Sequence, residues 1–332
     1  MNVRCHLVTI ASLVLASSLA EPVTLAEESS TLPRVIASRR VWDRAPHNGF
    51  ADLVVFRGEI VAALREGQSD VRGGVLRIIA SRDAQTWESR ALLTASDVDL
   101  RAPRLNVTPT SHLHLLAAAA LPPSAPARHQ TVAWSSTDGR RWSASSPIGE
   151  PNFWIWDVDW RGESAYGIGY PTAGQDFARL YESTNGRRFR PLVKQLLPGQ
   201  HPSESALLFL ADGSAACLAR RSAETGTTLV GRSPPPYTDW GWSDSGQRLG
   251  GANMIQLPDG RIVVATHIFR AGVLTALCWL DLQGGRLEEF LRLPFAGNAG
   301  SIGLLRHRNL LWVAYSSEHE GKPGLYLAEV EL

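Results

Sequence analysis

Charged and aromatic side chains stand at the ends of several short apolar segments in this chain of 332 residues. Arg65-Glu66 and Arg220-Arg221 each close a segment of small apolar residues, and Tyr315 is followed by Ser-Ser-Glu-His-Glu. Planar guanidinium groups match carboxylates in a bidentate geometry. If the fold gathers these segment ends, the resulting set of arginine, glutamate, histidine and aromatic residues forms a candidate site that could select an anion.

A repeated turn motif indicates how the chain could gather them. Segments that begin at Ser81, Ser136 and Ser183 share the pattern Ser-x-Asp/Asn-Gly/Ala-x-x-aromatic and start 55 and 47 residues apart. The Asp or Asn can bond the turn backbone, the Gly accepts a positive φ, and the aromatic ring can pack back on the sheet, which is typical of a tight β-hairpin. Residues 233–240 and 279–285 carry weaker copies. A period near 50 residues indicates a solenoid, a propeller or an array.

The apolar segments around these turns predict groups of four short strands. The first group covers residues 51–57, 60–64, 75–80 and 87–93, and the pattern repeats over 101–147, 156–193, 206–243 and 254–293. The last group, 302–306, 310–315 and 325–330, lacks a fourth strand, which residues 34–42 can supply. Closure of this kind removes exposed sheet edges. The prediction is an all-β fold, a six-bladed β-propeller of four-stranded antiparallel blades closed by an N-terminal strand, with residues 27–332 as its single domain.

The topology of such a blade selects the residues that can meet. The start of the innermost strand and the end of the second strand lie on one face, and the repeated turn lies on the opposite face. The residues expected to converge near the axis are His47, Asn48, Arg65, Glu66, Asp70, Asp99, Arg101, Arg104, Trp154, Trp156, Tyr166, Tyr170, Glu204, Arg220, Arg221, Asn253, His267, Tyr315, Ser317, Glu318, His319 and Glu320. The alternative is that they are solvated charges at strand ends.

Composition limits the possible functions. The 33 basic and 32 acidic residues give a net charge of +1, so no global field attracts nucleic acid or anionic lipid. Only Lys194 and Lys322 are lysines, and this bias makes each arginine weaker evidence for an anion site. The sequence has no phosphate-binding loop, nucleophile elbow or nucleic-acid module. The histidines lack a metal-ligand spacing, so we expect neither metal nor cofactor.

The N-terminal residues predict export. Arg4 precedes an apolar run from residue 7 to 19, and small residues before Ala20 and Ala26 resemble cleavage sites, so residues 1–26 read as a signal peptide. No later stretch is apolar enough over about 18 residues to span a membrane. Cys217 and Cys278 lie in apolar segments, where buried free thiols are expected, although export would permit a disulfide. We expect an exported monomer.

The repeated turn in a six-bladed propeller resembles the sialidase (neuraminidase) superfamily, also known as Asp-box or BNR-repeat propellers. The resemblance covers essentially the whole mature chain and is closest to bacterial secreted exo-α-sialidase-like proteins of unproven activity. Matching stretches lie at residues 56–58, 64–67, 99–101, 236–240, 250–253 and 319–322. The resemblance implies a ligand that is a glycan or an acidic sugar, with possible hydrolysis of a terminal unit.

The resemblance also implies roles for individual residues. Tyr315 would be the nucleophile, activated by Glu204, and Asp99 would be the acid/base. Arg65, Arg101 and Arg220 would bind the substrate carboxylate. The other implied substrate-binding residues are Glu66, Asn253, His267, Trp154, Trp156, Tyr170, His319 and Glu320.

Two departures from the family pattern leave the activity open. His47-Asn-Gly-Phe50 stands where the family has Phe/Tyr-Arg-Ile-Pro, and His267 stands where a third arginine is expected. Neutral histidine is a poor partner for a carboxylate. Trp154 and Trp156 could stack on a sugar ring or pack between blades. We therefore carry two hypotheses, an exo-glycosidase and a non-catalytic glycan-binding or interaction propeller, beside a different enzyme such as a lyase.

Overall fold

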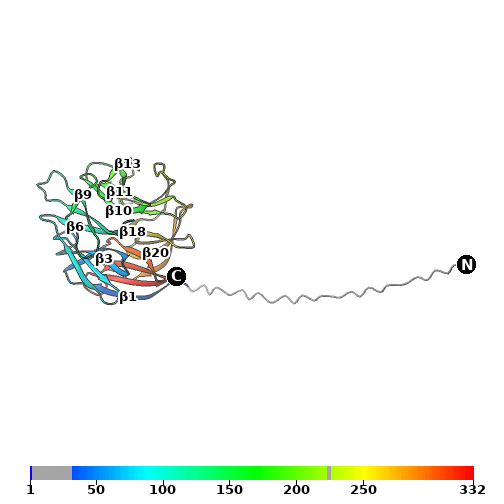
Figure 1. Ribbon diagram of the computed structural model, residues 1–332, viewed down its shortest axis with the longest axis horizontal. Coiled ribbons are helices and arrows are strands. Elements are labelled where there is room, and N and C mark those ends of the chain that lie inside the picture. The colour runs from blue at the N-terminus through cyan, green and yellow to red at the C-terminus, as the bar shows by residue number, and fades with distance from the viewer. Residues whose placement is uncertain (2–31, 223–225) are drawn as a thin grey trace. The chain divides into compact units, whose positions relative to one another are not determined.

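A computed structural model describes Met1, residues 32–222 and residues 226–332 of the chain. Residues 33–332 form one compact unit of 24 strands, and no helix occurs in the described residues. The strands make six four-stranded antiparallel sheets, each meandering outward from an innermost strand. The predicted six-bladed propeller is therefore confirmed (Figure 1). The predicted signal peptide, residues 1–26, lies outside the described residues.

The strands of the first three blades match the predicted segments, except that β9 (Ser146–Ile148) is shorter than predicted and covers only the end of residues 142–147. Blade I contains β2 (His47–Phe56), β3 (Glu59–Gly67), β4 (Val75–Ser81) and β5 (Glu88–Leu93). Blade II contains β6 (Asp99–Val107), β7 (Leu113–Ala120), β8 (His129–Ser136) and β9 (Ser146–Ile148). Blade III contains β10 (Phe153–Arg161), β11 (Ser164–Pro171), β12 (Ala178–Ser183) and β13 (Arg190–Leu196).

The remaining blades follow the same order, except that the last borrows a strand from the N-terminal end. Blade IV contains β14 (Pro202–Phe209), β15 (Ala215–Arg221), β16 (Leu229–Ser233) and β17 (Gly241–Asp244). Blade V contains β18 (Leu249–Gln256), β19 (Ile262–Phe269), β20 (Val273–Asp281) and β21 (Arg286–Leu293). Blade VI contains β22 (Gly303–His307), β23 (Leu310–Ser317), β24 (Gly324–Glu331) and β1 (Arg34–Trp42).

The strand β1 closes the ring as predicted. It pairs antiparallel with β24 and supplies the outermost strand of blade VI, so the two ends of the propeller domain lie in one sheet. In Figure 1 the blue β1 runs beside the red C-terminal strands. Because main-chain hydrogen bonds across this pair join residues nearly 300 positions apart, the closure stabilises the ring against opening at an exposed edge.

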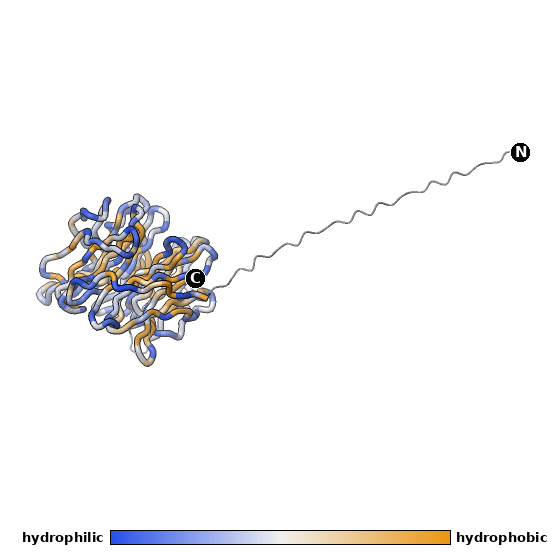
Figure 2. Tube along the Cα trace, turned by 90° about the horizontal axis from the view of Figure 1, so that it is seen from below, coloured by the Kyte–Doolittle hydropathy of each residue, from blue (hydrophilic) through white to orange (hydrophobic). Residues whose placement is uncertain are grey.

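The hydrophobic core is divided among the junctions between blades. Six apolar clusters occur, and each combines residues of two neighbouring blades, including blades VI and I. Each middle strand is therefore covered on both faces, which explains why the second strands are apolar without alternation. All but the last residue of β7 are buried, as are eight of the nine residues of β3. Figure 2 shows the hydrophobic segments within the domain and hydrophilic segments along its loops.

The repeated turns adopt the hairpin geometry that their residues predict. In blade II, Oδ1 of Asp138 accepts hydrogen bonds of 2.8 Å from the backbone N–H groups of Arg140 and Arg141, and Gly139 has a φ of 72°. Asn185 of blade III accepts the equivalent bonds at 2.9 Å. Blade I uses Asp83 in the same way. These turns lie at the face of the ring opposite to the starts of the inner strands; we call the two faces the turn face and the start face.

Both described cysteines are buried and free, so no bond joins Cys217 of blade IV to Cys278 of blade V. Burial raises the pKa of both thiols. They are core residues of two different junctions between blades. No helix in the described part of the chain is long and apolar enough to cross a bilayer.

Candidate functional site

The inner strands of blades I to V are bulged near the start face. Their pairing shifts at Gly49/Asp52, Arg101/Arg104, Ile155/Asp157, Pro202/Ser205 and Gly250/Asn253. Phe50, Ala102 and Gly251 within these bulges have φ values of 50°, 43° and 61°. A bulge redirects side chains and often adjoins a functional site. The residues before and after each bulge consequently have different surroundings, which the strand pattern alone does not predict.

Residues that follow the bulges close the axis of the ring. Arg104 is fully buried, and its two terminal nitrogens each donate a 3.3 Å hydrogen bond, to the Ile302 and Ala252 carbonyls of the opposite blades. Asn253 donates a 3.2 Å bond to the same Ile302 carbonyl. Asp52 accepts a 2.9 Å bond from the backbone N–H of Leu105 in the next blade. Asn253, expected to bind substrate, instead lies in this structural plug.

Three aspartates of the inner strands, Asp52, which is buried, and Asp157 and Asp159, which are partly exposed, were not selected by the sequence analysis. Burial raises the pKa of Asp52 to about 7, and the positive charge of Arg104 opposes the shift. Burial also raises the pKa of Asp157, and it raises that of Asp159 to about 6. Asp157 and Asp159 accept backbone hydrogen bonds from Leu207 and Phe209 of the neighbouring inner strand. The sequence did contain a sign of this structural role, because each aspartate interrupts a strand that is otherwise largely apolar.

An aromatic platform lies on the start face at the edge of blade III. The rings of His129, Trp154 and Tyr170 stack in order, with centroids 5.8 and 5.7 Å apart and planes inclined by 24° and 22°. Trp156 packs against Trp154 at 5.5 Å and is only 3% exposed. The indole Nε1 atoms of Trp154 and Trp156 are buried, and among the described residues neither has a hydrogen-bond partner. The sequence analysis predicted this grouping of Trp154, Trp156 and Tyr170 but missed His129.

One ion pair borders the platform on the side of blade IV. Arg220 donates a 2.9 Å hydrogen bond to Oε1 of Glu204, and the N–H of Gly251 donates a 2.9 Å bond to Oε2. A Cβ at Gly251 would overlap the Gly300 carbonyl oxygen, so this N–H needs glycine to reach Glu204. Burial holds the pKa of Tyr170 well above its ordinary value, the charge of Glu204 adds to the shift, and Arg220 and Arg101 oppose it. Tyr170 therefore lies within the electrostatic reach of the pair.

A second charged group borders blades I and II. Asp99 accepts hydrogen bonds from Arg65 at 2.7 Å and from Arg101 at 2.6 Å, and these bonds help to lower its pKa against the effect of burial. Arg65 is fully buried and also donates to the carbonyls of Leu100 and Ser69. Of the two arginines, only Arg101 keeps solvent access, with 26% of its side chain exposed. Arg65 thus has a structural environment, and Arg101 is the arginine here that a ligand can reach.

Glu66 is engaged within blade I. It accepts a 2.7 Å bond from the indole N–H of Trp42 and a 2.9 Å bond from Arg77. It is 7% exposed. Its position at the end of β3 was predicted correctly, but its carboxylate holds blade VI to blade I.

The structure does not bring Tyr315 and Glu204 together. Tyr315 is fully buried among apolar residues of blades V and VI, and among the described residues its hydroxyl has one hydrogen-bond partner, Ser38 of β1, at 3.0 Å. Burial raises its pKa. The partners of Glu204 are Arg220 and Gly251. The expectation that Glu204 reaches across to Tyr315 is therefore wrong, because the Tyr315 ring faces the junction between blades and not the axis.

Three further predicted residues lie around blades V and VI. His267 is fully buried, shares a 3.0 Å hydrogen bond with Thr275, and has a pKa that burial lowers to about 4. His319 is exposed and stacks on Tyr326 with ring centroids 4.4 Å apart. Glu320 is exposed and pairs with Arg40 at 3.4 Å. The structure gives none of the three a contact with the platform.

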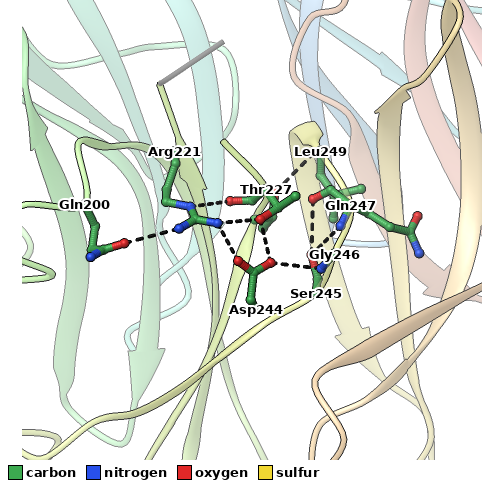
Figure 3. A network of polar contacts seen from close by, with 9 residues as sticks. Gln200, Arg221, Thr227, Asp244, Ser245, Gly246, Gln247 and Leu249 are labelled. Atoms are coloured by element: carbon green, nitrogen blue, oxygen red, sulfur yellow. Dashed lines mark hydrogen bonds and ion pairs between the residues drawn. The ribbon is translucent and has the colours of Figure 1, made fainter. Parts of the chain in front are cut away.

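Arg221, which neighbours Arg220 in sequence, has a structural role. It donates hydrogen bonds to the Thr227 carbonyl at 2.7 Å, to Gln200 at 3.2 Å and to Asp244 at 2.5 Å (Figure 3). Asp244 also accepts a 2.5 Å bond from the Thr227 hydroxyl. Figure 3 shows the guanidinium enclosed by these partners. Arg220 is consequently the arginine of this pair that faces the platform.

The space beside the ion pair of the platform is small. The space enclosed by Trp156, Glu204 and Arg220 has a volume of about 10 Å³, which admits at most one water molecule. A ligand on this face must therefore lie over the platform. No group of three or more His, Cys, Asp or Glu side chains in residues 32–222 and 226–332 is arranged to hold a metal ion.

Comparison with known proteins shows the fold. No family model and no curated protein sequence matches the chain. A protein of unknown function from Dyadobacter fermentans is similar in structure, with 16% identity, a TM-score of 0.75, and coverage of 90% of this chain and 99% of that one. An α-L-arabinanase from Penicillium chrysogenum, complexed with arabinobiose, has 13% identity, a TM-score of 0.67, and coverage of 89% and 98%.

A sialidase shares the same architecture. The NanB sialidase from Streptococcus pneumoniae has 11% identity and a TM-score of 0.66, with coverage of 88% of this chain and 70% of that one. At these identities the likeness shows a common fold. The expected six-bladed propeller fold is therefore confirmed, and the same fold occurs in both an arabinanase and a sialidase.

Proposed function

We propose that this protein binds a sugar on its start face, across the platform formed by His129, Trp154 and Tyr170. The observation that carries the proposal is the stack of three partly exposed rings, bordered by the Glu204–Arg220 pair and by Arg101. The apolar C–H face of a sugar packs well on such rings, and charged side chains at the rim can bind its polar groups. The arabinanase and the sialidase of the same fold support a sugar as the ligand class.

Two partly exposed arginines at the platform could bind the carboxylate of an acidic sugar, although each is already paired with a carboxylate of the chain. The Nε atom of Arg220 is buried and has no hydrogen-bond partner among the described residues, although another nitrogen of the group binds Glu204. Because 23% of the Arg220 side chain is exposed, its terminal nitrogens are the atoms that could donate to a ligand carboxylate. Arg101 would face the other end of the platform, and Glu204 would accept from sugar hydroxyls.

Hydrolysis is the second candidate function, and one observation favours it. Burial is the main cause that raises the pKa of Tyr170, and the charge of Glu204 adds to the shift, so this tyrosine and this carboxylate are near enough to interact electrostatically. In this version Glu204 takes the proton of Tyr170 as its oxygen attacks the anomeric carbon, and the leaving alcohol takes a proton from water, because the two arginines keep Asp99 ionised. A second water then breaks the bond between the sugar and Tyr170 and returns the proton to its hydroxyl. The two hypotheses share one binding surface and differ in whether a bond is broken.

Two variants and one control test the binding. We expect Trp154→Ala to weaken binding of neutral and acidic sugars at the platform, because it removes the middle ring of the stack. Arg220→Gln should weaken binding of acidic sugars only. Arg57→Gln, an exposed change on the turn face, is the matched control. Calorimetry with methyl glycosides of arabinose, galactose, glucuronic acid and N-acetylneuraminic acid measures the effect, and equal affinities in all four proteins would exclude this platform as the site.

A screen with fluorogenic glycosides separates hydrolysis from binding. If the protein is a hydrolase, Tyr170→Phe should abolish turnover with the sugar still bound, and Tyr315→Phe should leave turnover unchanged. Binding without turnover of any glycoside would leave the non-catalytic function.

We further propose that the protein is exported as a monomer after removal of residues 1–26 or a slightly shorter leader. The support is the sequence pattern ahead of Ala20 and Ala26. Mass spectrometry of the mature chain from the producing cells tests the cleavage, and light scattering tests the monomer. An intact Met1 in the secreted fraction would contradict the first proposal.

A further inference from the structure

A second cavity, of about 540 Å³, lies on the turn face between blades II and III. Its wall includes His114, Ser135, Trp160 and Arg187. This volume falls within the range of small-molecule sites, whereas the space on the start face holds at most one water. The cavity shares no lining residue with the platform, so it is a separate feature of the molecule.

The cavity exists because the outer strand of blade II is short. The strand β9 has three residues and pairs with β8 only from Thr131 to Ala133. The next residues of β8, Trp134 and Ser135, have no outer strand beside them and line the cavity instead. The equivalent outer strand of blade III, β13, has seven residues.

The main chain at this edge is already satisfied. The N–H of Ser143 donates a 2.9 Å bond to the Ser135 carbonyl, and the N–H of Ser135 donates a 3.0 Å bond to the Ser143 hydroxyl. An extended peptide that added a strand would need a row of unpaired main-chain groups. A ligand in this cavity would therefore be bound by side chains and not by main-chain groups, which favours a small polar molecule over a peptide strand.

Two buried polar groups at the cavity lack partners. His114 is 4% exposed, and neither ring nitrogen makes a hydrogen bond of standard geometry within the described residues, although the Gly186 backbone lies close enough to affect its pKa. The indole Nε1 of Trp160 is also buried without a partner, and the two rings meet edge to face at 6.5 Å. Burial lowers the pKa of His114 to about 4, against the effect of the nearby Gly186 backbone, so the ring is neutral and can both donate and accept. Buried groups of this kind are normally satisfied by water or by a ligand.

The rim adds hydroxyl groups and balanced charge. Ser135 offers a hydroxyl whose one partner among the described residues is Arg187 at 3.5 Å, whereas the hydroxyls of Thr108 and Ser143 already bond their own loops. Arg187 and Glu163 carry opposite charges at the same rim. An indole wall with hydroxyls around it matches a sugar ring, which has an apolar face and a polar edge. The offset of the two charges favours a ligand without net charge.

We propose that this cavity binds a neutral mono- or disaccharide, with the ring against Trp160 and with sugar hydroxyls bonded to Trp160 Nε1 and His114. The site is independent of the proposed platform, since it stands on different residues and lies on the opposite face. A chain that holds one sugar on each face could bind two separate glycans at once.

The experiment uses variants that affect one face each. Trp160→Ala removes the wall of the cavity. Thr110→Trp narrows its mouth from an exposed position without changing the core, and Thr86→Trp, the same change at an exposed turn in blade I, is the matched control. Trp154→Ala removes the platform and leaves the cavity. The probes are methyl glucoside, methyl galactoside, methyl mannoside, lactose and maltose, measured by saturation-transfer NMR and calorimetry.

We expect at least one of these neutral sugars to bind with a Kd on the order of 1 mM, both in the native protein and in Trp154→Ala. Trp160→Ala and Thr110→Trp should each weaken that binding about tenfold or more, and Thr86→Trp should not. If Trp160→Ala fails to fold, Thr110→Trp decides alone. Binding that Thr110→Trp leaves unchanged, or that disappears in Trp154→Ala, would overturn the inference without touching the proposal for the platform.

Discussion

Replacing Asp52 by asparagine tests the energetics of the axial plug. Asp52 is buried in the ring, where Leu105, Leu53 and Asn253 direct donors at its oxygens and Arg104 lies nearby. Its pKa is raised from 3.8 to about 7, chiefly by burial. The folded protein therefore holds a proton on this carboxyl that the unfolded chain releases near pH 4.

The sign and the size of the effect follow from that shift. Because the folded-state pKa of Asp52 lies above the unfolded value, its contribution to stability is fully present below about pH 4 and is lost as the pH rises through 7. One pKa unit corresponds to about 1.4 kcal/mol, so a shift of about three units gives up to about 4 kcal/mol. The histidines His114 and His267 act in the opposite sense, since their lowered pKa values remove stability as the pH falls below 6.5.

The assay is urea unfolding of the native protein and of Asp52→Asn at pH values from 4 to 8, followed by tryptophan fluorescence. Subtracting the two curves cancels the histidines and the other aspartates, which both proteins share. We expect the advantage of the native protein over the variant to shrink by a few kcal/mol between pH 4 and pH 8. A difference that grows with pH would refute the reasoning, because it would mean that Arg104 and the three N–H donors keep Asp52 ionised in the folded ring.

Three further predictions concern the ring and its turns. Arg104→Met should raise the pKa of Asp52 further, because the guanidinium charge opposes the shift in the native protein. The pH dependence of the unfolding free energy should then move to higher pH. An unchanged dependence would contradict the proposed coupling between Arg104 and Asp52. Asp138→Ala should destabilise the fold by about 1–2 kcal/mol, because two backbone hydrogen bonds of 2.8 Å are lost. Asp138→Asn should cost less than about 0.5 kcal/mol, because the natural Asn185 makes the same bonds in blade III. The denaturation midpoints of the two variants measure these losses of stability. Deletion of residues 1–42 removes β1, exposes the edge of β24 and breaks the Tyr315–Ser38 bond, so size-exclusion chromatography should show aggregates; a well-behaved monomer would contradict the closure.

The architecture was predictable because its signals are local and repeated. Each Asp or Asn turn fixes a hairpin, and each apolar segment supplies a strand that must be covered on both faces. The closing strand followed from counting, since the last blade lacked one strand and residues 34–42 were unassigned. These inferences depend on spacing and period, which the sequence displays directly.

The site was harder to predict because it depends on the direction in which each side chain points. Tyr315 is near the end of β23 as expected, but alternate residues of a strand face opposite sides, and its ring faces the junction with blade V. Glu204 lies within a bulge that turns it towards Gly251. No pattern in the sequence marked these bulges. The tryptophans were easier, because large rings near the start of one inner strand must lie close to each other.

The most direct test of the account compares Trp154→Ala with Tyr315→Phe in one calorimetric titration, using the sugar that the native protein binds most tightly. Trp154 is the centre of the platform, and Tyr315 is buried between two blades with its hydroxyl on Ser38. The account predicts at least a tenfold loss of affinity for Trp154→Ala, about 1.4 kcal/mol, and no change for Tyr315→Phe. Loss of binding in Tyr315→Phe with native affinity in Trp154→Ala would contradict it.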